Sequence, residues 1–248
     1  MSFTEEKREW IKKYMLEKIR QDDGAYAQKT MENFEVSITT VKRYLKECVE
    51  QKIIVPNADK ECGYCLITVE EEWEVDNVED LEEDTFYFDK VFPILNDLSE
   101  NSRKIWYYAF TEMMNNAIEH AKAKRICCKV KKDVLYTEIS IADDGIGIFN
   151  SIRQYADQQL HIKMDTAQAR MELYKGKFTT SPESHSGEGI FFTSKMLAQF
   201  ALWSEDVMYS NRCDDEAKFV RSHLIAYYTK LNRIGTMVQM KLENDTKR

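Results

Sequence analysis

Residues 112–121 constrain the fold of this chain more than any other segment. They read Glu-Met-Met-Asn-Asn-Ala-Ile-Glu-His-Ala, and Glu112 and Asn116 are four residues apart, which puts both side chains on one face of a helix. Apolar residues recur at helical spacing on the opposite face, which predicts that this face packs into the protein core. These residues are Ile105, Ala109, Phe110, Met113, Ala117 and Ala121.

A carboxylate and an amide at this spacing suit a metal–phosphate site. Asn116 can supply an oxygen ligand to a hard ion such as Mg²⁺, and Glu112 can act as a base that orients water or a hydroxyl group. Pairs of this kind also occur on ordinary solvated helix faces, so the pair alone leaves both interpretations open.

Two glycine-containing segments follow downstream. Asp-Asp-Gly-Ile-Gly at 143–147 comes after an apolar strand predicted over 137–142, and Ser-Gly-Glu-Gly-Ile at 186–190 begins a helix predicted over 190–200. Glycines at a helix N-terminus let backbone N–H groups approach a phosphate, where the helix dipole also favours an anion. Either segment alone fits a plain turn. The three segments together predict a nucleotide pocket.

The order and spacing of the three segments, over roughly residues 90–242, resemble the GHKL nucleotide-binding superfamily (gyrase, heat-shock chaperones, histidine kinases and mismatch-repair ATPases). The resemblance implies an α/β sandwich in which a helical layer covers a mixed sheet. It implies Mg-ATP as the ligand, with Asn116 binding Mg²⁺ and Glu112 activating the attacking group. Asp143 would bond the adenine amino group, with Gly147 beside it.

The same resemblance assigns the remaining nucleotide contacts. Gly145 belongs to the first glycine box, and Thr236 on the predicted final strand would support Asp143, although a strand threonine is also simply a good β-former. Residues 149–185 correspond to the ATP lid, in which Lys177 would suit a triphosphate or would be an ordinary loop residue. The phosphates would lie at Ser186, Gly187 and Gly189, although this segment departs from the Gly-x-Gly-Leu-Gly form of histidine kinases.

The first 68 residues predict three helices and a hairpin. The helical period begins near Trp10, Ser37 is placed to cap the third helix, and Gly63 interrupts two short strands. This pattern resembles a winged helix-turn-helix, in which the third helix would contact DNA. Modules of this shape also dock proteins, and the net charge of −8 weakens the DNA interpretation. The candidate DNA-binding residues are Thr39, Thr40, Lys42 and Arg43.

The acidic run at 69–84 predicts a boundary between domains, because such runs are usually solvated. We therefore expect a winged-helix domain over residues 1–68, an acidic linker or exposed edge over 69–85, and an ATP-binding domain over 86–248. The pair Cys62 and Cys65 favours a hairpin turn over a zinc site, because no second Cys-x-x-Cys pair is present.

Composition indicates a globular protein of the cytoplasm. Hydrophobic residues make up 43% of the 248 residues, which is enough for a core, and no apolar run approaches the ~20 residues of a membrane helix. The first residues contain no apolar signal-peptide core, and six cysteines fit a reducing compartment as thiols. We expect no membrane partner.

Three classes of function remain open at this stage. The chain is an ATP-controlled transcription regulator, a serine/threonine protein kinase resembling anti-sigma factors, or a signalling adaptor that binds ATP and barely turns it over. A histidine kinase is a weaker interpretation, because a winged helix precedes the ATP-binding segment where that class has a dimerising hairpin with a phospho-accepting histidine. The protein partner, the DNA site and homodimer formation stay open.

Overall fold

The computed structural model describes residues 4–76, 78–175, 189–205, 207–211 and 227–245. The chain divides into two compact units: Met1–Val69 with Lys132–Tyr136 (unit 1), and Glu70–Lys131 with Thr137–Arg248 (unit 2). Within the described ranges, no helix combines the length and the apolar composition needed to cross a membrane.

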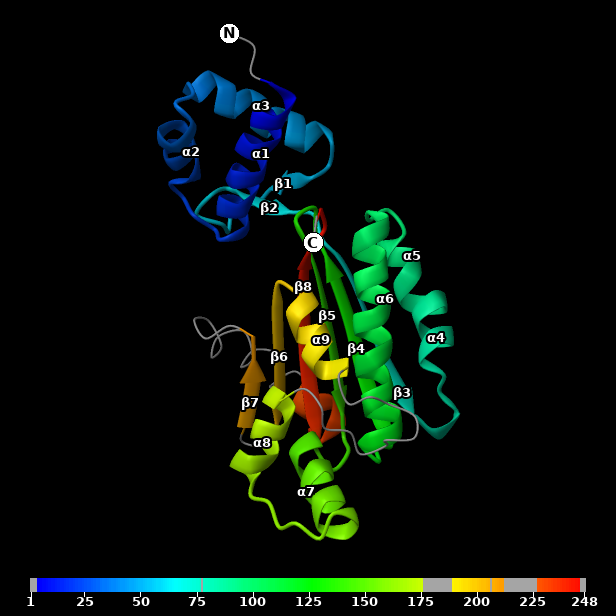
Figure 1. The fold of residues 1–248 in the computed structure, drawn as a ribbon. Coiled ribbons are helices and arrows are strands. Elements are labelled where there is room, and N and C mark those ends of the chain that lie inside the picture. The colour runs from blue at the N-terminus through cyan, green and yellow to red at the C-terminus, as the bar shows by residue number, and fades with distance from the viewer. Residues whose placement is uncertain (1–3, 77, 176–188, 206, 212–226, 246–248) are drawn as a thin grey trace. The chain divides into compact units, whose positions relative to one another are not determined.

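Unit 1 contains three helices and a two-stranded antiparallel sheet (Figure 1). Its core is formed by the apolar faces of α1 and α3 together with the first strand, and includes Ile11, Met15, Val41, Tyr44 and Ile54. The elements are α1 (Glu5–Arg20), α2 (Tyr26–Phe34), α3 (Ile38–Glu50), β1 (Ile54–Pro56) and β2 (Tyr64–Leu66).

Local sequence signals account for the ends of these elements. The Ser37 side chain accepts a hydrogen bond from the backbone N–H of Thr40, which confirms the predicted cap of the third helix. The hairpin interpretation is also confirmed, since Cys65 pairs with Val55 across β1 and β2. Gly63 lies at the turn with φ +75°, a left-handed conformation that favours glycine.

Residues 132–136 belong to unit 1 although their neighbours in sequence lie in unit 2. Asp133 is buried there, and its carboxylate accepts hydrogen bonds from Arg20 Nε at 2.9 Å and from the N–H groups of Leu135 and Tyr136 at 2.8 Å each. The Tyr136 hydroxyl donates to Glu17 at 2.6 Å.

Unit 2 is built on a six-stranded sheet in the order β3-β4-β5-β8-β6-β7, with helices against one face (Figure 1). The strands are β3 (Val69–Asp76), β4 (Arg125–Lys132), β5 (Tyr136–Asp143), β6 (Gln199–Ser204), β7 (Val207–Ser210) and β8 (Thr236–Glu243). The helices are α4 (Glu83–Phe86), α5 (Phe92–Leu95), α6 (Glu100–Asn115), α7 (Ile148–Gln159), α8 (Thr166–Lys175) and α9 (Gly189–Met196). Shorter helical turns are η1 (Val78–Asp80), η2 (Tyr87–Val91) and η3 (Asn116–His120), of which the last two are π-helical.

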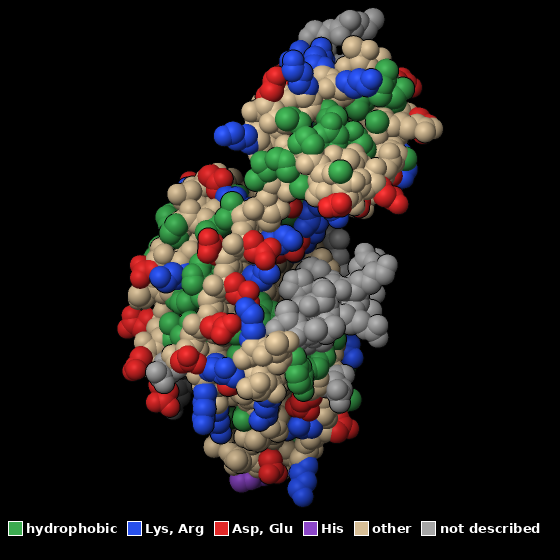
Figure 2. Space-filling model, turned by 180° about the vertical axis from the view of Figure 1, so that it is seen from behind, with side chains coloured by type: hydrophobic (Ala, Val, Ile, Leu, Met, Phe, Trp, Pro, Cys, Tyr) green, Lys and Arg blue, Asp and Glu red, His purple; other side chains and the backbone are tan. Residues whose placement is uncertain are grey.

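Strand alternation separates the two faces of this sheet, because successive side chains point to opposite sides. On the helix-covered face, Ile139 and Ile141 of β5 and Met240 of β8 join a core that α6 closes with Trp106 and Phe110. The opposite face carries a smaller apolar cluster and paired charges, and Figure 2 shows acidic and basic side chains interleaved in the view from behind. The pairs include Lys129–Glu70, Lys230–Glu72 and Lys241–Glu138.

The fold class is thus mixed α/β, but the sheet is antiparallel where a mixed sheet was expected. β6 pairs antiparallel with both β7 and β8. The end of β5 meets the start of β8, since Gly235 N–H donates to the carbonyl of Asp143 at 2.7 Å. β4 and β5 are joined by a tight turn, which only antiparallel neighbours allow.

One open alternative is decided by the structure, and one further expectation is corrected. Of the two alternatives for the acidic residues 69–76, a linker or an exposed edge, the structure shows the exposed edge: they form an edge strand of the sheet, and most of their side chains are exposed. The helix predicted over 190–200 ends at Met196, and Gln199 begins β6. Asn211 fixes this change, because its amide donates to the carbonyl of Ser194 at 2.7 Å and accepts from Phe200 N–H at 2.9 Å.

Candidate functional site

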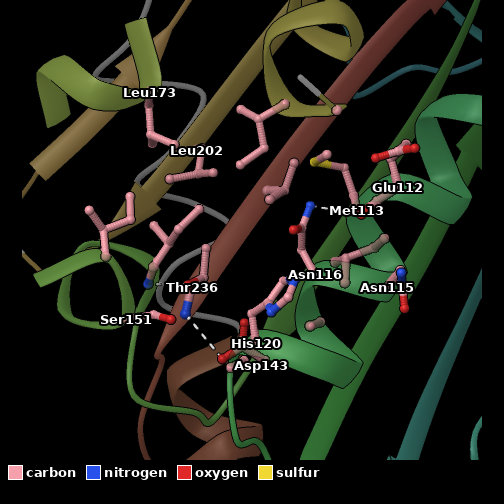
Figure 3. A pocket seen from close by; sticks show the side chains of 18 of the residues that line it. Glu112, Met113, Asn115, Asn116, His120, Asp143, Ser151, Leu173, Leu202 and Thr236 are labelled. Atoms are coloured by element: carbon pink, nitrogen blue, oxygen red, sulfur yellow. Dashed lines mark hydrogen bonds between the residues drawn. The ribbon is translucent and has the colours of Figure 1, made fainter. Parts of the chain in front are cut away.

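A pocket in unit 2 lies between α6 and its π-helical continuation η3 on one side and the strands β5 and β8 on the other (Figure 3). The N-terminus of α9 borders the pocket, as does α7. Glu112, Asn116, Asp143, Gly189 and Thr236, all expected from the sequence to act together, line it. These residues come from separate elements, so the fold alone brings them together.

Asp143 is the most constrained polar group of the pocket. It ends β5 and is 3% exposed. Its Oδ1 atom accepts hydrogen bonds from the N–H groups of Gly145 at 2.8 Å and Thr236 at 3.3 Å. Oδ2 accepts none from the described part of the chain. Asp143 therefore offers one oriented, unused acceptor atom inside a largely apolar cavity.

The electrostatics of Asp143 follow from this burial. Loss of solvation raises the pKa of the Asp143 carboxyl to about 7, although the N–H groups of Gly145 and Thr236 act in the opposite direction. Perturbed carboxyl groups of this kind are concentrated at functional sites. The ionised form becomes favourable when a ligand supplies a hydrogen-bond donor to Oδ2.

Two glycines allow the chain to fold tightly around Asp143. A Cβ atom at Gly145 would lie 2.1 Å from the carbonyl oxygen of Ala121, at the end of η3. A Cβ atom at Gly235 would lie 2.5 Å from Asp143 Oδ1. Neither approach is compatible with a side chain, so the two glycines are required by packing around the carboxylate.

Gly147 has a different task. Its φ is +88°, and a Cβ atom added at this position would lie 2.7 Å from Ser204 Oγ. Both features require glycine at the start of α7. Neither Gly145 nor Gly147 is among the residues that line the pocket. In this structure the two glycines have backbone roles that hold Asp143 and α7, and their nucleotide contacts stay a prediction.

Thr236 supports the site through its backbone and not through a hydroxyl bond to Asp143. Its N–H donates to Asp143, whereas its hydroxyl oxygen accepts from Ile148 N–H at 3.1 Å. Ser204 Oγ accepts from the same N–H at 3.1 Å and donates to the Gly235 carbonyl at 2.7 Å. Two hydroxyl groups thus cap the first turn of α7 and join it to β6 and β8.

The other end of the pocket is formed by Glu112, Asn116 and Gly189. Asn116 Nδ2 donates to the carbonyl of Glu112 at 2.7 Å, which fixes the amide so that its oxygen remains available as a ligand. A Cβ atom at Gly189 would lie 1.9 Å from Glu112 Oε2. The glycine therefore lets the carboxylate reach the N-terminus of α9.

Glu112 and Asp143 lie toward opposite ends of the pocket (Figure 3). Gly145, whose N–H donates to Asp143, lies against the carbonyl of Ala121, which follows Glu112 by nine residues along α6 and η3. At the α-helical rise of 1.5 Å per residue, these nine residues span at most about 13 Å along the helix axis. π-helical turns such as η3 are rare in proteins, and those that occur often lie at functional sites. The pocket is elongated, with a carboxylate at each end.

Much of the pocket wall was not singled out from the sequence. Many of these residues are apolar, and their sequence signal was only that of core-forming positions. His120 and Ser151 add polar groups near Asp143 (Figure 3). The apolar lining includes Ile141, Ile148, Ile152, Leu173, Ile190, Phe191, Leu202 and Val238.

Lys177, Ser186 and Gly187 lie outside the described residues, as do the other positions between 176 and 188, which include the last ten residues of the predicted lid. The candidate DNA-binding residues lie on α3 of unit 1. Thr39, Lys42 and Arg43 are exposed there, and Thr40 is half-buried beside the Ser37 cap. Arg43 also lies over the Tyr44 ring, 5.0 Å from its centroid.

The comparisons with known proteins add no family assignment: no protein-family model and no curated protein matches this chain. Among the described residues, no group of three or more His, Cys, Asp or Glu side chains is placed to hold a metal ion. A metal at this site would therefore need oxygen ligands from a bound molecule in addition to Asn116.

The buried carboxyl of Asp143 predicts a pH-dependent stability. Between pH 4 and 7 the folded protein retains a proton on Asp143 that the unfolded chain releases, so the free energy of unfolding falls as pH rises through this window. The loss is up to about 4 kcal/mol, from about 1.4 kcal/mol per unit of pKa difference. Asp143→Asn keeps the acceptor for Gly145 and Thr236 and should abolish this component.

Urea unfolding at pH 5 and pH 8 gives the change in the free energy of unfolding between the two pH values. The contribution of Asp143 is the difference between this change in wild type and in Asp143→Asn. Asp144→Asn is the matched control, because Asp144 accepts from the N–H groups of Lys124 and Arg125 outside the pocket. An identical pH dependence in wild type and Asp143→Asn would contradict a buried, proton-retaining carboxyl.

Proposed function

We propose that unit 2 binds ATP as its magnesium complex, in the manner of the GHKL superfamily. The observation that carries the proposal is the Asp143 carboxylate: Oδ1 is held by two backbone N–H groups, and Oδ2 is an unused acceptor in an apolar slot. A planar base with an exocyclic amine supplies the donor that this acceptor lacks. The adenine amino group fits that requirement, and the apolar walls suit its ring faces.

The second end of the pocket supports a phosphate position. The separation of at most about 13 Å along the helix axis between Glu112 and the Asp143 end suits a nucleotide that extends from its base to its phosphates. Asn116 would bind Mg²⁺ through its side-chain oxygen, and phosphate oxygens would supply further ligands. Gly189 begins α9, whose first N–H groups and dipole favour an anion.

Turnover would depend on Glu112. Its carboxylate would accept a proton from a water molecule as the oxygen attacks the γ-phosphorus, and the bond from phosphorus to the bridging oxygen of ADP would break. The products are ADP and inorganic phosphate. A protein hydroxyl in place of water would give a phosphoprotein, which is the serine/threonine kinase alternative. An adaptor would bind ATP without either reaction.

The ATP proposal predicts base selectivity that depends on Asp143. Guanine presents a carbonyl oxygen where adenine presents its amine, so an ionised Asp143 should favour ATP over GTP. Asp143→Asn puts an amide donor in that place, since Oδ1 stays bound to the two N–H groups. Calorimetry at pH 8 should show ATP affinity reduced by the equivalent of about 1–3 kcal/mol and GTP discrimination diminished.

Asp144→Asn serves as the control in this experiment and should leave both affinities within twofold, about 0.4 kcal/mol. Equal ATP affinities for wild type and Asp143→Asn would refute the base assignment, and an unchanged preference over GTP would do the same.

A second prediction separates binding from chemistry at the other end. Asn116→Ala should weaken Mg²⁺-dependent ATP binding, and Asn116→Asp should restore it because an oxygen ligand is kept. Glu112→Gln should leave ATP affinity near normal but reduce turnover by about 10²–10⁴-fold, the typical cost of losing a general base.

Labelled ATP, with and without cell lysate, distinguishes free phosphate from phosphoprotein in wild type and variants. ATP binding without turnover above the Glu112→Gln background would reject the catalytic role of Glu112 and favour the adaptor. Phosphate transfer to a lysate protein would favour the kinase.

We further propose that unit 1 is a winged helix-turn-helix that contacts DNA through α3. The supporting observation is that Lys42, Arg43 and Lys46 are exposed on the side of α3 that faces away from its buried Val41 and Tyr44. Basic side chains on an exposed helix suit phosphate contacts. Two acidic residues on the same helix reduce its net positive charge. Glu47 Oε1 lies 3.9 Å from Arg43 Nε, and Glu50 Oε1 lies 3.6 Å from Lys46 Nζ. A protein-docking role is the alternative.

The variant Lys42→Ala/Arg43→Ala should weaken DNA binding and flatten its salt dependence, by about one unit of log–log slope for each phosphate that the protein no longer neutralises. Lys104→Ala/Lys163→Ala removes the same charge from exposed positions of unit 2 and should have little effect. Fluorescence anisotropy with duplex DNA at several salt concentrations measures both. If the full chain does not bind duplex DNA even at low salt concentration, the DNA-binding proposal is rejected and the protein-docking role is favoured.

A further inference from the structure

A second pocket of unit 2 lies on its surface where η2 and the start of α5 meet the first half of α6, away from the ATP site. In Figure 1, α4 and α5 run beside α6. Its wall is aromatic, with a basic edge. We call it the Tyr87 pocket, and it comprises Tyr87, Phe88, Phe92, Glu100, Arg103, Lys104 and Tyr107.

Two hydrogen-bond donors in this pocket have no partner. The Tyr87 side chain is 1% exposed, and its hydroxyl makes no hydrogen bond within the described part of the chain. The same holds for the buried Nε–H of Arg103. Burying a polar group without a hydrogen bond is costly, so each such group needs an explanation. Buried donors without a partner within the described residues also occur at Arg8 Nε and on Tyr44, Trp106 and Thr193, but Tyr87 and Arg103 line one surface pocket together.

Both groups are donors, and one belongs to a cation. Burial raises the pKa of the Tyr87 hydroxyl to about 12, so it keeps its proton at physiological pH. The missing partner is therefore an acceptor, and beside a guanidinium a carboxylate is the strongest acceptor available. The nearby Glu100 does not fill this role, because its carboxylate pairs with Lys104 at 2.7 Å.

The aromatic wall indicates what surrounds that carboxylate. Phe88 is 53% exposed and Tyr107 is 38% exposed, with ring centroids 5.6 Å apart. The Tyr107 hydroxyl donates to Asp84 at 2.9 Å, which holds its ring in place. Exposed aromatic residues beside a half-buried arginine are typical of protein–protein interfaces, where Tyr and Arg contribute much of the binding energy.

We propose that the Tyr87 pocket binds an acidic segment of a partner protein. One Asp or Glu carboxylate of the segment accepts from the Tyr87 hydroxyl and the Arg103 Nε–H, and a neighbouring apolar side chain packs on Phe88 and Tyr107. The occupant is a peptide segment because the exposed aromatic rings extend the surface beyond what one carboxylate covers. This interaction is independent of nucleotide binding.

The probe is the capped pentapeptide acetyl-Ala-Leu-Glu-Phe-Ala-amide, compared with the same peptide carrying Gln in place of Glu. Binding is followed on the full chain by the ¹⁵N–¹H signal of the Arg103 Nε–H, assigned with Arg103→Lys. The acidic peptide should shift this signal and bind about tenfold tighter than the Gln peptide, as expected for a charge-assisted pair.

Tyr87→Phe removes only the hydroxyl and should weaken the acidic peptide about fivefold or more. Tyr44→Phe is the matched control, since it removes an equally buried, unpaired hydroxyl from unit 1, and it should leave peptide binding unchanged. Phe88→Ser, at an exposed position, tests the aromatic wall without disturbing the core and should weaken both peptides.

Equal affinity for the Glu and Gln peptides, or full affinity in Tyr87→Phe, would overturn the proposal. If 3-phenylpropionate binds through the same residues as tightly as the peptide, the pocket is a small-carboxylate site and peptide docking is rejected. Sedimentation of the chain alone covers the remaining occupant: a dimer that Tyr87→Phe dissociates would replace the partner protein with a second copy.

Discussion

The hydrogen bonds from Gly145 and Thr236 to one oxygen of Asp143 are the interaction on which the rest of the site depends. They tie the end of β5 to the turn before α7 and to the start of β8, so three separate segments converge on one carboxylate. Because Oδ1 is used in this way, the direction of Oδ2 into the pocket is fixed. Because Asp143 is buried, its ionised carboxylate is unfavourable unless a hydrogen-bond donor approaches Oδ2. Gly145 and Gly235 pack closely around this carboxylate, where a side chain would clash.

The pocket therefore has a buried hydrogen-bond acceptor, Asp143, at one end and the polar pair Glu112 and Asn116 at the other. α6 and its continuation η3 span both, because a stripe of core residues fixes the helix against the sheet while Glu112 and Asn116 project along the pocket. The transition to a π-helical turn at Asn116 changes the direction of side chains just where the ligand would lie. A single helical segment thus spans the distance between base and phosphates in the proposed complex.

Sequence reasoning could predict the elements and the polar residues of the site, because each has a local signal: helical spacing for Glu112 and Asn116, a strand followed by glycines for Asp143, and a serine cap for α3. It could not predict that Leu173 and Leu202 close the pocket, since their apolar character serves any core. It could not predict that Thr236 contacts Asp143 through its backbone N–H, because a backbone N–H carries no sequence signal. For residues 69–76 the sequence left a linker and an exposed edge open, because acidic side chains suit both and only the pairing with β4 distinguishes them.

The most direct test of this account is the titration of the Asp143 carboxyl itself, by ¹³C NMR of aspartate-labelled protein with Asp143→Asn for assignment. Without nucleotide the pKa should lie near 7. A non-hydrolysable ATP analogue should lower it by about one unit or more, since the adenine amine would stabilise the ionised form. Inorganic triphosphate and GTP should not. A pKa that stays near 7 when the ATP analogue is bound would contradict the central claim that Asp143 recognises the base.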